Sequence, residues 1–276
     1  MVLQEVGGLF LTVSPPEGAS RVVGHRFPSM TRSKVGIVVP PHYFDTTSTE
    51  LTSLCAEVDV LHTQIRVSPD FGFTLDEIVQ TGEEISDCAA SLVAAGAEVV
   101  LQMGTPFSTA HGWSAGQELQ RRITERIGIP FEMMGLSVPA GIHALGARRV
   151  ALATTYYDPE WVDRYTGYAE ESGLEVLGSA SFTDQGRFGS HAEAWSASFQ
   201  GFDPAFSIES IIEVGRAFPE AEAVLVPGMP GRILDLVPDA EAELDRPIVS
   251  YFSIWWRCLS HLGRAANRPA GRLLNS

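Results

Sequence analysis

Four short loops carry the residue types that could do chemistry, and each follows an apolar run typical of a buried strand. A loop between a strand and a helix presents free backbone N–H groups, which suit a carboxylate, and small residues let a ligand approach the backbone closely. Taken singly, Thr105, Ser108 and Thr155 are ordinary turn or helix-capping residues, so the interpretation depends on all four loops ending equivalent strands. The loops are 40–43 (PPHY), 104–108 (GTPFS), 154–158 (TTYYD) and 227–231 (PGMPG).

Histidines near these loops are candidates for proton transfer, because the ordinary pKa of histidine, about 6.5, suits acid–base work at neutral pH. His42 lies in the first loop, His111 follows the second, and His191 lies in a stretch rich in glycine and serine that we expect to be a loop. A single histidine of this kind is more often structural than catalytic. No HxH or HExxH spacing occurs, so we expect no metal site.

The three cysteines, Cys55, Cys88 and Cys258, form no CxxC or metal-binding pattern and fall on expected helices away from the loops. We expect them to be buried as small apolar residues. An odd number of cysteines without a signal peptide favours a reducing compartment, so we expect a cytoplasmic protein.

Strand and helix patterns alternate from residue 34 onward, which predicts an α/β fold with parallel sheets and helices on both faces. The pattern restarts near Arg149, and this weak internal repeat predicts two similar Rossmann-like lobes, related by a pseudo-twofold axis, with an active-site cleft between them. Strands are expected at 34–40, 58–63, 98–103, 130–134, 149–154, 174–180, 223–227 and 247–251, and helices at 48–56, 74–95, 114–127, 137–145, 159–172, 207–218, 233–244 and 254–262.

We divide the chain into an N-terminal arm at 1–33, a first lobe at 34–145 plus 248–276, and a second lobe at 146–247. The arm contains several prolines and glycines and no sustained periodicity. An alternative for part of it is a short extra strand at 9–13.

Composition excludes several classes of function. The net charge of −15 disfavours binding to nucleic acid, whose phosphates require a basic surface. Lys34 is the only lysine, so the chain has no phosphate-binding Gly-Lys-Ser/Thr loop, and no lysine besides Lys34 could form a Schiff base with pyridoxal phosphate. Apolar runs fall short of the roughly 18 residues of a membrane-spanning helix, so we expect no membrane contact. We expect no cofactor.

Beyond these patterns, three segments resemble arylmalonate decarboxylase, a member of the Asp/Glu racemase superfamily that also contains maleate isomerase. They are 34–41 (KVGIVVPP), 100–112 (VLQMGTPFSTAHG) and 129–173, and the resemblance extends over roughly residues 34–272. It implies that two lobes bind a small carboxylic acid between them and that the reaction passes through a carbanion or enolate. Racemases of this superfamily use one cysteine from each lobe, whereas the decarboxylase keeps only the second.

The resemblance also assigns roles to individual positions. Thr105 and Tyr156 match residues that bind the substrate carboxylate, whereas Pro106 replaces a hydroxyl-bearing neighbour and Met229 a glycine. Gly104 and Gly228 fall at the first and second cysteine positions, so both family thiols are absent. Trp161 stands where an asparagine is common. We take Tyr156, His42 and His191 as candidate catalytic residues, and Pro40, Gly104, Thr105, Pro106, Tyr157, Gly228 and Met229 as candidate substrate-binding residues.

Three functions remain open at this stage. The first is a cofactor-independent lyase, most simply a malonate-type decarboxylase, with a histidine, a tyrosine or water as the proton source. The second is a maleate-type cis–trans isomerase or another lyase or hydrolase of the same superfamily. The third is a non-catalytic protein that binds a small acid, which becomes the better interpretation if neither His42, His111 nor His191 reaches the cleft. A homo-oligomer is compatible with the resemblance, because family oligomers are common, and the sequence does not fix the state.

Overall fold

The computed structural model describes residues 32–43, 45–229 and 231–276. The expected N-terminal arm and its alternative strand at 9–13 lie outside the described residues, except that Ser33 already opens the first strand. Within the described part of the chain, no helix is long and apolar enough to cross a membrane.

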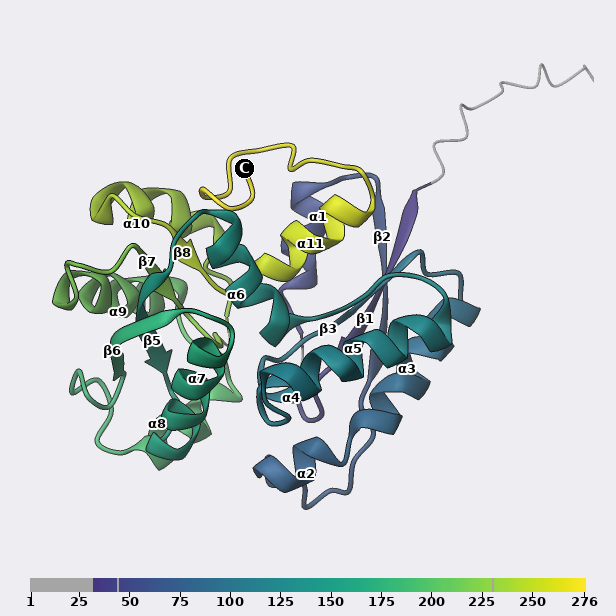
Figure 1. Cartoon of the computed structure of the whole chain (residues 1–276), viewed down its shortest axis with the longest axis horizontal. Coiled ribbons are helices and arrows are strands. Elements are labelled where there is room, and N and C mark those ends of the chain that lie inside the picture. The colour runs from purple at the N-terminus through teal and green to yellow at the C-terminus, as the bar shows by residue number, and fades with distance from the viewer. Residues whose placement is uncertain (1–31, 44, 230) are drawn as a thin grey trace, which may run out of the picture. The chain divides into compact units, whose positions relative to one another are not determined.

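Two four-stranded parallel sheets form the centre of the fold, which confirms the predicted α/β class (Figure 1). The first sheet has the order β2-β1-β3-β4 and the second has the order β6-β5-β7-β8, so the two halves repeat the same topology. The strands are β1 (Ser33–Val39), β2 (Val58–Gln64), β3 (Val99–Gln102), β4 (Phe131–Met133), β5 (Arg149–Thr155), β6 (Glu175–Ser181), β7 (Ala223–Leu225) and β8 (Ile248–Val249).

The inner strands are buried, except for Lys34 and Arg149 near their starts, because helices cover both faces of each sheet, as their continuous runs of valine, isoleucine and leucine require. On the first sheet, α1 lies on one side and α3 and α5 on the other (Figure 1). On the second sheet, α9 contacts β5 and β7 and packs on α10, α7 contacts β6, and α6 contacts β7 and β8. The helices are α1 (Ser48–Leu54), α2 (Leu75–Val79), α3 (Gly82–Ala94), α4 (Pro106–Thr109), α5 (Trp113–Ile127), α6 (Met134–Ala144), α7 (Pro159–Glu171), α8 (His191–Ser198), α9 (Pro204–Ala217), α10 (Val237–Leu244) and α11 (Ser253–His261), with a 3₁₀ turn, η1, at Leu234–Leu236.

Local capping explains where several helices begin. Thr74 and Glu77 form a reciprocal capping box at the start of α2, and the Asp158 side chain accepts from Trp161 N at the start of α7, with Pro159 in the first helical position. The helix expected at 74–95 is instead two helices. The break falls at Thr81, whose hydroxyl donates to the Ile78 carbonyl and whose successor is glycine, a poor helix former.

The second lobe differs from the prediction at its end. Residues 248–276 were assigned to the first lobe, but β8 pairs in parallel with β7 and therefore belongs to the second sheet. α11, in contrast, contacts β3 and β4 of the first sheet, and it packs closely on α6. The chain therefore crosses back between the sheets after β8, at Ser250–Phe252.

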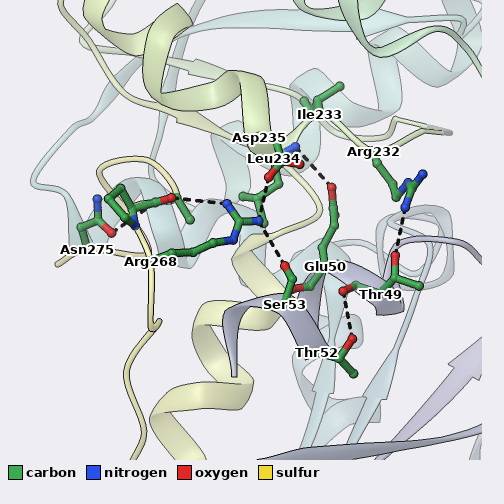
Figure 2. A network of polar contacts seen from close by, with 12 residues as sticks. Thr49, Glu50, Thr52, Ser53, Arg232, Ile233, Leu234, Asp235, Arg268 and Asn275 are labelled. Atoms are coloured by element: carbon green, nitrogen blue, oxygen red, sulfur yellow. Dashed lines mark hydrogen bonds and ion pairs between the residues drawn. The ribbon is translucent and has the colours of Figure 1, made fainter. Parts of the chain in front are cut away.

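Polar contacts join α1 to the segment that follows β7 (Figure 2). Glu50 of α1 accepts a hydrogen bond from Leu234 N, and Thr49 accepts one from Arg232 Nη1. Arg268, near the C-terminus, donates to Ser53 of α1 and pairs with Asp235. These contacts tie the two sheets together beside the ends of their strands.

Candidate active site

A cavity of about 260 Å³ lies where the carboxyl ends of strands from both sheets meet. Pro40 and Gly104, which follow β1 and β3, line it from the first sheet, and Tyr156 and Gly228, which follow β5 and β7, line it from the second. The carboxyl ends of parallel strands are where open α/β sheets bind ligands, so this cavity is the candidate active site.

Aromatic side chains form much of the cavity wall. Tyr43 stacks on Phe199 with ring centroids 4.9 Å apart, and Trp195 lies 5.6 Å from Tyr156 and 5.9 Å from Phe73. The Tyr43 hydroxyl and Ser198 Oγ are 3.2 Å apart, so α8 closes over the loop that follows β1. Burial raises the pKa of Tyr43 to about 12. These contacts hold α8 against the loop that follows β1 and give the cavity a largely aromatic wall.

At the end of β3, the backbone conformation of Gly104 leaves no room for a side chain. Its φ of +92° is in the region that favours glycine, and a Cβ atom there would lie 2.8 Å from Pro40 Cγ and 3.1 Å from Phe107 Cδ2. The first position at which the resemblance implies a thiol in racemases is therefore closed by its neighbours.

At the end of β7, a tyrosine occupies the space beside Gly228. A Cβ atom at residue 228 would lie only 2.6 Å from Tyr157 Oη and 3.1 Å from its Cε2. Thr155, at φ 56°, is a non-glycine residue in a left-handed conformation, and its hydroxyl donates to the Gly228 carbonyl at 3.0 Å. This strained turn places the Tyr157 hydroxyl where a side chain at residue 228, the position at which the resemblance implies the second thiol, would begin.

The Tyr157 hydroxyl is the centre of a buried hydrogen-bond chain. It accepts from Tyr156 Oη at 3.1 Å and from Tyr165 Oη at 3.0 Å, and Tyr165 Oη lies 2.7 Å from Thr105 Oγ1. Burial raises the pKa of all three tyrosines, well above the ordinary value for Tyr156 and Tyr165. The two donated hydrogen bonds oppose this rise at Tyr157. The phenols therefore remain protonated at neutral pH, and Tyr156 connects them to the cavity.

Unpaired backbone donors line both strand ends. Among the described residues, the N–H groups of Gly104, Gly228 and Met229 donate no hydrogen bond to another protein group. Buried backbone N–H groups are nearly always paired, so donors left free beside a cavity suit an anionic ligand. No arginine, lysine or histidine is among the described lining residues, so these N–H groups are the main positive feature of the wall.

The structure brings together some of the expected site residues and separates others. Pro40, Gly104, Pro106, Tyr156, Gly228 and Met229 all line the cavity. Thr105 and Tyr157 are not among the lining residues; Tyr157 lies beside Gly228 and is bonded to Tyr156, and Thr105 joins the tyrosine chain through Tyr165.

None of the three histidines is among the lining residues in the described part of the chain. His42 is exposed and packs edge-on to Phe73, and His191 is the first residue of α8 rather than part of a loop. His111 is partly buried, and burial lowers its pKa.

Two features of the site were missed from sequence. The helix α8 supplies Trp195 and Ser198, yet its eight residues show no clear apolar period; the Ser190 cap, which accepts from Glu193 N, was its one signal. Asp45, in the loop after β1, also lines the cavity, and nothing in its sequence neighbourhood distinguishes it from a solvated loop residue.

The cysteines take no part in the site. Cys55, Cys88 and Cys258 are all buried, as expected, and burial raises the pKa of each, to about 12 for Cys258. Within the described residues, no group of three or more His, Cys, Asp or Glu residues could hold a metal ion.

Comparisons with known proteins identify the family of the chain. A family model described as arylmalonate decarboxylase matches residues 35–274. An arylmalonate decarboxylase from Bordetella bronchiseptica is 32% identical over 196 residues, which cover 70% of this chain and 78% of that protein.

Solved structures show the same fold. Unliganded arylmalonate decarboxylase has a TM-score of 0.73 at 26% identity, covering 88% of this chain and 99% of that chain. A maleate isomerase from Pseudomonas putida S16 has a TM-score of 0.71 at 18% identity, covering 88% of this chain and 98% of that chain.

Proposed function

The chain belongs to the arylmalonate decarboxylase family, and we propose that it is a cofactor-independent lyase that removes one carboxyl group from a small malonate-type acid. The relatives are decarboxylases and isomerases, so the chain is an enzyme of this group. The observation that carries the proposal is an apolar cavity at the strand ends, with free N–H groups on two sides and a phenol in its wall.

In this proposal the retained carboxylate binds to the N–H groups of Gly104, Gly228 and Met229. Breaking the C–C bond releases carbon dioxide and leaves the electron pair on the α-carbon, from which it spreads into the retained carboxylate as an enediolate. Negative charge thus grows on the oxygens that the N–H groups hold. Donors fixed in place before the reaction stabilise such charge most effectively.

The leaving carboxylate would face the aromatic part of the wall. Phe107, Phe199 and Met134 line the cavity and offer a carboxylate no hydrogen bond from their rings or thioether. A carboxylate held there loses its hydration, and cleavage to neutral carbon dioxide relieves this cost. The same wall would accommodate an aromatic or bulky alkyl substituent of the substrate.

We assign the final protonation to Tyr156. The Tyr156 hydroxyl, which donates to Tyr157 Oη in the resting site, turns its hydrogen to the substrate, and the O–H bond breaks as the α-carbon–hydrogen bond forms. Tyr157, which accepts from Tyr165, then donates its own hydrogen to the Tyr156 phenolate. A proton from solvent then restores Tyr156. Because no described lining residue carries a thiol, cysteine addition to maleate is not supported.

The test is a proton NMR time course in deuterated water with phenylmalonate, methylphenylmalonate and butylmalonate, and with maleate. We expect loss of one carboxylate and gain of one deuteron at the α-carbon. Tyr156→Phe should slow this reaction, whereas Tyr168→Phe, which removes a buried phenol outside the cavity wall, should not.

Each other outcome contradicts the proposal in a distinct way. Conversion of maleate to fumarate would indicate an isomerase. Turnover that is insensitive to Tyr156→Phe would refute the assigned proton donor. No change in any of these acids would exclude a malonate decarboxylase with this substrate range.

A further inference from the structure

Arg232 places a positive charge at the rim of the cavity. Gly231, the residue before it, lines the cavity, and no other described arginine or lysine is adjacent in the chain to a lining residue. The Arg232 guanidinium donates from Nη1 to Thr49 Oγ1 at 3.2 Å (Figure 2). This hydroxyl donates in turn, at 2.9 Å, to the carbonyl of Thr46, which also lines the cavity. Thr46, Thr49 and Arg232 are exposed, so the guanidinium lies at the solvent edge of the cavity and not within its wall.

No carboxylate in the described part of the chain forms an ion pair with Arg232. Asp235, which is close to it in the chain, pairs instead with Arg268 at 2.7 Å. Glu50 is buried on α1, where both of its oxygens accept from Tyr251. The charge of Arg232 is therefore available to an anion that approaches from solvent.

The rest of the molecule opposes the entry of an anion. The net charge of −15 repels a dianion, and the described lining residues include no arginine or lysine. The N–H groups of Gly104, Gly228 and Met229 offer hydrogen bonds at the strand ends but no net charge. A dianion that enters past Thr46 and Gly231 therefore meets a full positive charge at the rim. Such a local charge beside a cleft attracts anions of low molecular weight and raises their rate of association.

The proposed reaction changes the charge of the ligand. A malonate-type substrate is a dianion at neutral pH. Cleavage of the C–C bond releases neutral carbon dioxide, and a proton is added at the α-carbon, so the product is a monoanion. Because Coulomb attraction is proportional to the charge of the ligand, a fixed positive charge at the rim holds the substrate more strongly than the product.

We propose that Arg232 is a capture residue, which favours dianionic over monoanionic acids through its charge at the rim of the cavity. The inference rests on the proposed function for the position of the retained carboxylate. It assigns to one residue the preference for the substrate over its product.

Isothermal titration with two unreactive acids tests the inference separately from catalysis, at about pH 7.5 and an ionic strength of roughly 20 mM. Phenylsuccinate carries two carboxylates, and in its monoamide the carboxylate farther from the phenyl ring becomes a neutral amide of nearly the same shape. Two unit charges several ångströms apart in water attract each other enough to change binding about three-fold. Arg232→Gln should therefore weaken the monoamide about three-fold and phenylsuccinate about ten-fold. Salt at roughly 0.5 M should remove most of this difference.

Two further variants separate charge from local structure. Arg232→Lys keeps the charge and should keep the preference for phenylsuccinate. Arg148→Gln removes another exposed arginine that forms no ion pair with a described residue, at the start of β5 and thus at the end of the second sheet opposite the cavity. It should leave both affinities within about 1.5-fold of wild type. Thermal unfolding of each variant confirms that it folds.

Equal weakening of the two acids by Arg232→Gln, an equal loss of preference in Arg232→Lys, or unchanged binding would each overturn the inference and leave the proposed function intact. If neither acid binds to the wild-type protein, the carboxylate site of the proposed function is refuted, and the inference fails with it.

Discussion

Replacing Glu50 with glutamine should remove a pH dependence from the stability of the fold. Glu50 is 6% exposed on α1, and both of its oxygens accept from Tyr251 Oη, at 2.7 and 2.9 Å. Leu234 N also donates to it, at 3.3 Å (Figure 2). Burial raises the pKa of Glu50 from 4.5 to about 7, against the lowering effect of these hydrogen bonds.

The direction of this pH dependence follows from the protonation state of Glu50 that the folded protein favours. Because the pKa of Glu50 is higher in the folded state than in the unfolded state, its contribution to stability is fully present below pH 4.5 and is lost as pH rises through 7. A rise of this size corresponds to about 3 kcal/mol in total, of which roughly 2.5 kcal/mol falls between pH 5 and pH 8.5.

Urea unfolding of wild type and Glu50→Gln across this pH range measures the effect as a difference, so titrations common to both proteins cancel. We expect glutamine to gain roughly 2.5 kcal/mol relative to wild type as pH rises from about 5 to about 8.5. Glu175→Gln, an exposed residue of β6, serves as the control and should show no such trend. A difference that stays constant with pH, or that falls as pH rises, would refute a buried Glu50 with a raised pKa.

Three further predictions follow from the site. Tyr156→Phe should lower kcat about 10²- to 10⁴-fold with little change in KM, because it removes a proton donor and keeps the ring; steady-state rates on the substrate found by NMR measure this. Gly228→Cys should destabilise the fold by about 1–3 kcal/mol because its Cβ overlaps the Tyr157 phenol, and Tyr157→Ile in the same chain should recover part of this loss in urea unfolding. Iodoacetamide at neutral pH should leave activity unchanged, since burial raises the thiol pKa, to about 12 for Cys258; rapid inactivation, with alkylation mapped by mass spectrometry, would show that a thiol takes part.

The two parallel sheets could be predicted because the inner strands are continuous apolar runs that only a parallel sheet covered on both faces can bury. The break in the helix expected at 74–95 could not be predicted, because it depends on the hydrogen bond that the Thr81 hydroxyl donates to the Ile78 carbonyl. The eight residues of α8 were missed because this helix is stabilised by its packing over the cavity and not by its own pattern.

The sequence predicted which residues gather at the strand ends but not which way their side chains point. The ends of the strands can be located from the apolar runs. The direction of each side chain depends instead on backbone torsion angles that tertiary contacts impose, such as the left-handed conformation of Thr155. Thr155 turns the chain so that Tyr156 faces the cavity while Tyr157 lies beside Gly228. Thr105 likewise turns its hydroxyl to Tyr165 instead of the cavity.

A cavity wall that contains a phenol and, among its described residues, no thiol limits which reactions the site can support. Racemisation begins when a base removes a proton from carbon, and thiol-based isomerisation begins with a nucleophile. Tyr156, whose pKa burial holds well above the ordinary value, is protonated at neutral pH and serves poorly as either. Decarboxylation needs neither, because breaking the C–C bond itself creates the carbanion, and only a proton donor is required afterwards. A site with fixed N–H donors, an apolar wall and one protonated phenol therefore suits a reaction in which carbon dioxide leaves first and the proton arrives second.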